Sequence, residues 1–552
     1  MSLQLRAEQK KITDIFNNEV EYIIPNFQRP YSWGYGQCYQ LYSDIFDSFE
    51  KNEEFFLGNI VTANSQENSD FFQLIDGQQR ITTLLLWIKA LFLLYEEKFE
   101  SEHGGLKKAL YKEDWESGKL RRRLTSNILE TKDDDLIEII LSENFSQEQL
   151  IELFNKNKNR LENKIEDKAE IKNKFEMNFI YLYYWSKNDY ENNLKEFIIY
   201  LLKKVMLLPM QLNADNTDEA INKALKIFET INNRGMDLAD SDILKAKIYA
   251  LAIKDNNGPL FIKKWIELRE NLEIMNLKID DIFRFYLHII RGQEKLTTSE
   301  IGLRDFFTLE PYSPLKTKNY NEILDDLYNI VFVYEYIDER IKEKSKLSKW
   351  LQVIENYTNQ YPKIALVVFL FYTYKKTGSL SDESIIIDFC KNIIRYVYYK
   401  GATSTIKNEI YLIIKNIAWD IELKKYEYNL STNFFDSMGR LKKGFALLSY
   451  YLNNNDDDDI SNLSFNRLIT YSDKDFNNDN IDDIYDCLGN FVFLDLNKRN
   501  ISFESRIRFF DNSSIFKKQI HPHLIMQDPI SFIKERDEKL KNKLIEFMKG
   551  LI

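Results

Sequence analysis

The run Asp76–Arg80 (DGQQR) combines a carboxylate, a flexible glycine, two amides and a guanidinium. Apolar residues before it predict a strand, and the apolar residues after it repeat at helical spacing. Unpaired N–H groups at the start of such a helix favour an anion. Gln78, Gln79 and Arg80 could therefore clamp phosphate oxygens, and Asp76 could hold a divalent cation or a ribose hydroxyl. An ordinary turn followed by a surface arginine explains the shape equally well.

Residues 24–33 (IPNFQRPYSW) form a second element that could bind a ligand. Two prolines flank Gln28 and Arg29 and stiffen the backbone, so these side chains would lose little entropy on binding. Tyr31 or Trp33 could stack on a nucleotide base. The alternative has equal weight: the aromatic residues belong to a core, and Arg29 packs against one of them.

Residues 227–249 (IFETINNRGMDLADSDILKAKIY) contain a third element. Asn232 and Arg234 lie in an expected turn, Ser241 is suited to cap a helix, and Lys245 follows one turn later on the same side. Turn and helix together could close over a ligand. In isolation, a simple helix end followed by surface charges explains this pattern better.

The elements that must position these residues are mainly helical. The chain has 552 residues, more than one core usually supports, and only 9 Pro and 17 Gly. In residues 1–100, strand-like segments at 21–26, 56–62 and 71–75 predict a small α/β domain. Helical spacing predicts a large helical body over 101–452, in which 217–250 complete the N-terminal site. The polar run at 453–459 predicts a linker, and 453–552 predict a mixed α+β domain.

Composition excludes several protein classes. A net charge of −11 argues against a surface coated with nonspecific nucleic-acid-binding charge, although 119–123 and 498–508 could form local basic patches. The simpler explanation for each patch is a solvated surface. Cys38, Cys390 and Cys487 are widely spaced, which suits a reducing cytosol and excludes a thiolate zinc site. The longest apolar run, 81–95, is shorter than the roughly 20 residues that cross a bilayer. We therefore expect a cytoplasmic protein that does not enter a membrane.

With the FLGNIV element at 56–61, the FQRPYSW and DGQQR elements closely resemble the GmrSD family of prokaryotic DNA-restriction proteins. The 227–249 block is similar to a further family element. The resemblance implies a ParB/sulfiredoxin-like N-terminal domain that binds a nucleoside triphosphate with Mg²⁺. It implies catalytic roles for Asp76 and Arg80, and no dedicated metal ligands. Nucleotide contacts are implied for Gln28, Arg29, Tyr31, Trp33, Gly77, Gln78, Gln79, Asn232, Arg234 and Lys245.

The C-terminal domain resembles the family's His-Asn-His-type nuclease only in its later half, at Leu488, Gly489, Asn490, Asn497, Asn500, Phe503 and Arg506. In the earlier half, apolar spacing places Arg467 where the family has its general-base histidine, and arginine cannot accept a proton. The histidines are elsewhere, at His103, His288, His521 and His523. We therefore predict a degenerate His-metal-finger fold that contacts DNA through Arg467, Asn490 and Asn500 without cutting it.

These features leave three functions open. The leading hypothesis is a restriction or anti-phage defence protein that hydrolyses a nucleoside triphosphate to control DNA binding or cleavage, together with a protein partner or as a homo-oligomer. The second is an active endonuclease with rearranged catalytic residues, against which the missing histidine argues. The third is a non-enzymatic scaffold subunit of a defence complex. Nucleotide turnover separates the first two from the third, and DNA nicking separates the second from the first.

Overall fold

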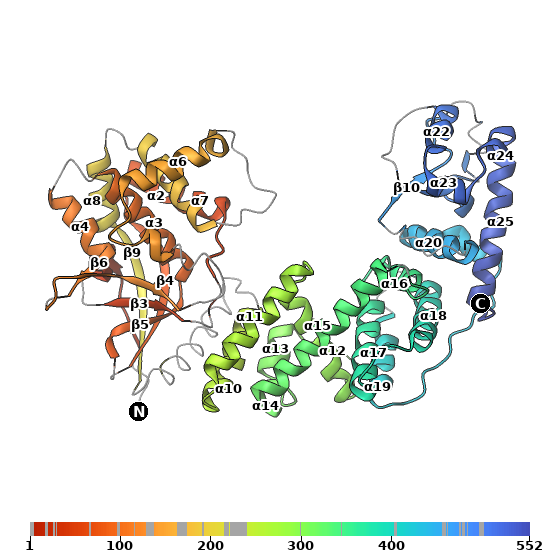
Figure 1. The fold of residues 1–552 in the computed structure, drawn as a ribbon, viewed down its shortest axis with the longest axis horizontal. Coiled ribbons are helices and arrows are strands. Elements are labelled where there is room, and N and C mark those ends of the chain that lie inside the picture. The colour runs from red at the N-terminus through yellow and green to blue at the C-terminus, as the bar shows by residue number, and fades with distance from the viewer. Residues whose placement is uncertain are drawn as a thin grey trace. The chain divides into compact units, whose positions relative to one another are not determined.

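The computed structural model of the chain describes residues 5–16, 20–25, 28, 30–65, 68–95, 100–114, 116–127, 137–162, 174–189, 193–214, 220, 240–298, 300–343, 345–401, 406–454, 460, 462–473, 476, 481–482, 484–495 and 502–552. The chain divides into two compact units, Met1–Glu267 and Leu268–Ile552. Helices predominate in both (Figure 1), which confirms the mainly α class. No described helix is long and apolar enough to cross a membrane.

A seven-stranded mixed sheet lies in the first unit (Figure 1). Its strands are β1 (Leu5–Ala7), β2 (Lys10–Lys11), β3 (Glu21–Ile24), β4 (Phe55–Ser65), β5 (Asn68–Asp76), β8 (Leu124–Ser126) and β9 (Val205–Ala214). The order is β1-β9-β4-β5-β3-β8, with β2 also paired to β9. Strand β4 runs parallel to β9 and antiparallel to β5, and β3 runs parallel to both β5 and β8. The predicted N-terminal α/β arrangement is therefore confirmed.

Two apolar clusters cover parts of this sheet. The larger contains α3 (Gln78–Leu94), which packs against α4 (Glu100–Leu110) and α7 (Lys174–Asp189). The smaller joins residues of β4, β5 and β9 to Ala246 of α10 (Asp240–Lys254). The other helices of this part are α1 (Ile12–Phe16), α2 (Tyr35–Glu50), α6 (Gln147–Glu162), α8 (Leu194–Lys204) and α11 (Gly258–Ile274), and β6 (Tyr111–Glu113) pairs with β7 (Leu120–Arg122).

Strands β6 to β9 lie within 101–452, where the sequence predicted a helical body, and β9 is the longest of these four. It pairs with β4 from Phe55↔Val205 to Ser65↔Ala214. A short apolar run can form either a strand or a buried helix, and its own periodicity does not distinguish them. The strand forms here because β4, more than a hundred residues earlier, supplies its backbone partners.

The helical part of the second unit contains α12 (Ile279–Gln293), α13 (Leu303–Thr308), α14 (Pro314–Thr317), α15 (Tyr320–Lys342), α16 (Ser348–Glu355), α17 (Tyr361–Thr377), α18 (Glu383–Lys400), α19 (Ile406–Ala418), η1 (Thr432–Ser437), η2 (Gly439–Leu441) and α20 (Lys442–Asn453). Capping agrees with the sequence, because Asn319 and Glu322 form a capping box at the start of α15. Gly378 ends α17 in the left-handed conformation.

The C-terminal part of the second unit is α+β, as predicted. Strand β10 (Ser464–Arg467) pairs antiparallel with β11 (Phe491–Leu494), which follows η3 (Leu488–Asn490). The helices are α22 (Phe503–Phe510), α23 (Ser514–Gln519), α24 (Pro522–Gln527) and α25 (Pro529–Met548). Apolar residues from these elements, among them Val492, Phe503 and Ile533, form one core cluster. The more specific expectation of a His-metal-finger fold stays a prediction.

Candidate functional site

The DGQQR run forms the predicted strand, turn and helix start. Strand β5 ends at Asp76, Gly77 has φ +85°, and α3 begins at Gln78. A Cβ atom at residue 77 would lie 2.6 Å from Ile60 Cγ2. Glycine is thus required both for the left-handed backbone and for the close approach of β4. The turn fixes where the first residues of α3 point.

Arg80 is largely buried in the first turn of α3. Its Nη2 atom lies 3.4 Å from Asp76 Oδ2, and its side chain is 11% exposed. Burial lowers the pKa of Arg80, and the Asp76 carboxylate opposes this shift. Gly58 of β4 makes room for the guanidinium: it has φ +119°, and a Cβ atom there would collide with Arg80 Nη1. The FLG glycine and the DGQQR arginine therefore depend on each other.

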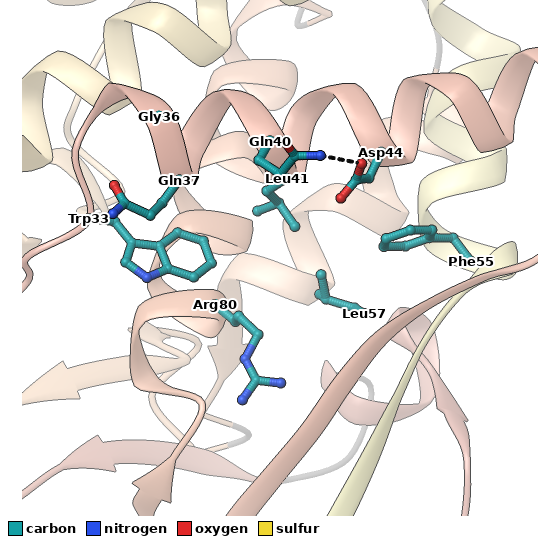
Figure 2. Close-up of a pocket in the computed structure, with 9 residues that line it drawn as sticks. All are labelled: Trp33, Gly36, Gln37, Gln40, Leu41, Asp44, Phe55, Leu57 and Arg80. Atoms are coloured by element: carbon teal, nitrogen blue, oxygen red, sulfur yellow. Dashed lines mark hydrogen bonds between the residues drawn. The ribbon is translucent and has the colours of Figure 1, made fainter. Parts of the chain in front are cut away.

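A pocket of about 430 Å³ opens beside Arg80. It is lined by Trp33, Gly36, Gln37, Gln40, Leu41, Asp44, Phe55, Leu57 and Arg80. Figure 2 shows Trp33 and Leu57 on either side of the Arg80 side chain, with α2 forming the opposite wall. Most of the lining is apolar. A buried cation next to an apolar, aromatic wall can bind a ligand that has an anionic group and a flat apolar group.

Gln79 and Tyr31 position this pocket without lining it. Gln79 Oε1 accepts hydrogen bonds from the backbone N–H groups of Ser32 (2.8 Å) and Trp33 (3.2 Å), and its Nε2 donates to Pro30 O (3.2 Å). Tyr31 is 7% exposed, and its hydroxyl lies 2.6 Å from Thr83 Oγ1. Of the two aromatic residues predicted to stack on a base, Tyr31 is in the core and Trp33 lines the pocket.

Asn178 on α7 has a positioning role that the sequence did not reveal. Its Nδ2 donates to the Tyr31 hydroxyl (3.0 Å) and to Trp33 O (2.8 Å), and the residue is 1% exposed. Residues 30–33 are therefore held by α3 from one direction and by α7 from another. The only local signal is a single amide within the buried, aromatic-rich stretch of α7.

The structure also brings Lys245 to the FQRPYSW element. Gln28 Nε2 donates to Ile75 O (2.8 Å), at the end of β5, and Lys245 Nζ lies 3.4 Å from Gln28 O. Lys245 is 3% exposed. Gln78, in the first turn of α3, is buried as well. The predicted residues Arg29, Asn232 and Arg234 lie outside the described residues.

In the C-terminal part, Arg467 is the last residue of β10, on the predicted strand, and its guanidinium bonds to neighbouring groups. Its Nη2 lies 2.7 Å from Asp486 Oδ1, and its Nε donates to Tyr485 O (3.0 Å). The guanidinium carbon lies 4.1 Å from the Tyr485 ring centre and 4.9 Å from that of Phe491. Lys442 pairs with the same Asp486 carboxylate at 2.5 Å. DNA phosphate would have to compete with this network for Arg467.

Asn490 lies in the core of the same domain. It is 0% exposed, its Oδ1 accepts from Ile469 N (2.8 Å), and its Nδ2 donates to Ile469 O (3.0 Å) and Tyr485 O (3.2 Å). Arg506 is likewise buried, in an ion pair with Asp473. These family-like residues hold the chain beyond β10 in place, and Asn490 has no surface with which to touch DNA. Asn500 and Asn497 lie outside the described residues.

Among the described residues, no hydrogen bond or ion pair joins a histidine to Arg467. His521 and His523 are exposed at the start of α24. His288 is buried, which lowers its pKa to about 4, so it is neutral near pH 7. Among the described residues, no group of three His, Cys, Asp or Glu is placed to hold a metal ion.

In the basic run at 119–123, the three arginines bond to acidic side chains or to backbone carbonyl groups. Arg121 pairs with Asp114 (3.0 Å), and Arg122 pairs with Glu138 (3.1 Å). Arg123 is 5% exposed and donates to backbone carbonyl groups. The simpler explanation of a structural and solvated run therefore accounts for these residues.

Comparison with known proteins supports the resemblance seen in the motifs. No curated protein matches the chain. The family model described as the GmrSD restriction endonuclease, N-terminal domain, matches residues 12–249. This span contains the FQRPYSW, FLG and DGQQR elements and Lys245, and restriction enzymes of this kind have DNA as their target. Residues 12–249 are therefore similar to the N-terminal domain of the GmrSD restriction endonucleases.

Proposed function

We propose that this restriction-family chain binds and hydrolyses a nucleoside triphosphate beside Arg80, and that nucleotide turnover controls its action on DNA. The observation that carries the proposal is the Arg80 guanidinium at the edge of a pocket that is also lined by Trp33. The pocket volume of about 430 Å³ lies within the range of small-molecule sites.

Three features favour phosphate at Arg80. Its guanidinium offers planar, charge-assisted hydrogen bonds. It lies in the first turn of α3, where the helix dipole is positive, and the N-cap Gly77 has no side-chain cap. Partial burial strengthens the attraction between the guanidinium and an anion. The 3.4 Å separation from Asp76 leaves this ion pair loose enough for phosphate to compete.

The remaining parts of the nucleotide have suitable surroundings. Trp33, Leu57 and Phe55 present apolar surface for a base or ribose. A Mg²⁺ ion would be held chiefly by phosphate oxygens and water, so one carboxylate such as Asp76 suffices from the protein. The ion would neutralise phosphate charge, while Arg80 would stabilise the charge that develops on the transferred phosphoryl group. Gln79 and Asn178 keep Trp33 in place during this step.

We also propose that the C-terminal domain does not cut DNA. The general-base position holds Arg467, which stays protonated and is paired with Asp486. A protein partner would then supply cleavage. Other surfaces of the domain would still be able to contact DNA, in a manner that weakens with salt.

The nucleotide proposal is tested by calorimetry with non-hydrolysable triphosphates and by phosphate release with and without DNA. Arg80→Ala should weaken binding by tenfold or more, because a charged hydrogen bond contributes about 1.5–3 kcal/mol. Arg80→Lys should retain part of the affinity. Arg121→Ala, which removes a surface arginine, is the matched control. Unchanged affinity in a folded Arg80→Ala protein would contradict the proposal.

The nuclease proposal is tested by incubating the full chain with plain and modified DNA, Mg²⁺ or Mn²⁺, and each triphosphate. No nicking by the purified chain is expected. Specific nicking that survives Arg467→Ala but disappears with His521→Ala and His523→Ala would overturn the proposal and favour a nuclease with rearranged residues.

A further inference from the structure

Besides Arg80, the pocket contains a second charged group, the Asp44 carboxylate. It lies on α2 and lines the same pocket as Arg80. Its Oδ1 accepts a hydrogen bond from Gln40 Nε2 (2.7 Å), drawn as the dashed line in Figure 2. No lysine, arginine or histidine of the described residues forms an ion pair with it. A partly exposed carboxylate in an open pocket can accept hydrogen bonds from the N–H groups of a ligand.

The two charged groups of the pocket differ in what they can bind. Arg80 is a donor and suits phosphate, whereas Asp44 is an acceptor and repels phosphate. Figure 2 shows Asp44 on the α2 wall, with Leu41 and Leu57 between it and Arg80. A nucleotide placed with its phosphates at Arg80 would therefore direct its base toward α2.

Neighbouring amides make the α2 wall rich in acceptors. Gln40 uses its Nε2 on Asp44, so its Oε1 is left to accept. Asp44 adds its second oxygen. Gln37 Oε1 already accepts from Gly34 N (3.0 Å), so Gln37 offers its Nε2 as a donor. The wall thus presents acceptors at Gln40 and Asp44, with a donor one turn earlier.

The four common bases differ in how they meet a carboxylate. Guanine carries two adjacent donors, N1–H and the 2-amino group, which can bind both oxygens at once, and its O6 beside them accepts. Adenine and cytosine place a ring acceptor next to their amino group, and uracil has one N–H between two carbonyl oxygens. In these three bases an acceptor would face the carboxylate and repel it. Guanine is the base whose edge complements Asp44.

We propose that Asp44 makes this pocket selective for guanine nucleotides. This inference rests on the proposed nucleotide site and adds the base that the site prefers. Gln40 acts as a positioning residue that orients the Asp44 carboxylate.

Calorimetry on the full chain, with non-hydrolysable analogues of GTP, ATP, CTP and UTP, tests the selectivity. Wild type should bind the GTP analogue about tenfold more tightly than the others, or more, since a charged hydrogen bond is at stake. Asp44→Asn should remove this preference and leave the other three affinities unchanged. Asp44→Asn should also improve binding of xanthosine triphosphate, because an asparagine amide can donate to its 2-oxo group. Asp47→Asn, at an exposed position of α2 outside the pocket, is the matched control.

The possible failures are distinguishable. If no triphosphate binds wild type, the proposed function itself fails. If triphosphates bind with equal affinity, and Asp44→Asn changes none of them, the guanine inference fails and the site stands. If Asp44→Asn weakens all four equally, and only when Mg²⁺ is present, Asp44 is a metal ligand and the guanine inference is overturned.

Discussion

Arg80 and Arg467 are the same residue type in similar local surroundings, yet the structure uses them differently. Each forms an ion pair with an aspartate, and each lies near aromatic or apolar side chains. Arg80 approaches Asp76 at 3.4 Å and borders a pocket. Arg467 approaches Asp486 at 2.7 Å, donates to a backbone carbonyl and lies over the rings of Tyr485 and Phe491.

The two guanidinium groups differ in how far each is available to a ligand. Planar stacking and two donated hydrogen bonds already satisfy Arg467, so a new anion would gain little there. Arg80 has a looser ion pair and a pocket beside it, so phosphate can add contacts before any are lost. This difference depends on the backbone at Gly58, because any side chain at residue 58 would occupy the space that the Arg80 guanidinium needs.

The largest effect is expected from Gly58→Ala, which removes that space. The new Cβ atom would collide with Arg80, and the backbone at φ +119° would be strained by about 1–3 kcal/mol. Nucleotide binding should be lost, and the midpoint of thermal unfolding should fall. Gly104→Ala, where a Cβ atom meets nothing within 4 Å, should bind nucleotide normally. The double variant Gly58→Ala/Arg80→Ala should be more stable than Gly58→Ala alone, because the collision is removed. If it is not, the proposed dependence of Gly58 and Arg80 on each other is wrong.

Asn490→Ala tests whether the family-like asparagine of the C-terminal domain is structural. The variant loses three hydrogen bonds in a fully buried site, so unfolding should become easier by about 1–3 kcal/mol. Urea denaturation measures this change. Asn466→Ala, a nearby buried asparagine whose described bond is to Ser464 Oγ, should cost less. Reduced DNA binding at unchanged stability would instead give Asn490 a functional role.

Asn178→Ala tests whether Asn178 holds the pocket residue Trp33 in place. Loss of the bonds to the Tyr31 hydroxyl and Trp33 O should loosen Trp33 and weaken nucleotide binding about three- to tenfold, at a cost of about 1 kcal/mol each. Asn157→Ala removes a buried asparagine bonded within its own helix, and should change stability without changing affinity. Equal affinities of the two variants would show that Asn178 is structural only.

The smallest effect is expected for Arg467→Ala on DNA binding. Because Asp486 and the stacked rings occupy the guanidinium, the loss of DNA affinity should be about twofold or less. A direct phosphate contact would instead lower the salt dependence of binding by about one unit. Titrations at several salt concentrations distinguish these outcomes. Arg508→Ala, at a side chain that is 78% exposed, is the matched control. If Arg467→Ala lowers the salt dependence by one unit and Arg508→Ala does not, Arg467 contacts phosphate directly. The proposed contrast between Arg80 and Arg467 would then be wrong.

Local patterns predicted much of the N-terminal site. The strand, glycine turn and helix start at Asp76–Gln78 follow from residue types and apolar spacing, and the structure has them in place. The same reasoning could not separate Tyr31 from Trp33. Both are aromatic and two residues apart, and their burial depends on α3 and α7, which come from elsewhere in the chain.

What the sequence alone determined is local: the mainly helical character and the anion-favouring start of α3. Tertiary structure decided which side chains share a pocket. Strand β9 joined β4, Asn178 reached residues 30–33, and α2 supplied Asp44 opposite Arg80. Such contacts join segments far apart in the chain, where partner positions depend on the packing of the whole unit. Spacing along the sequence carries no information about them.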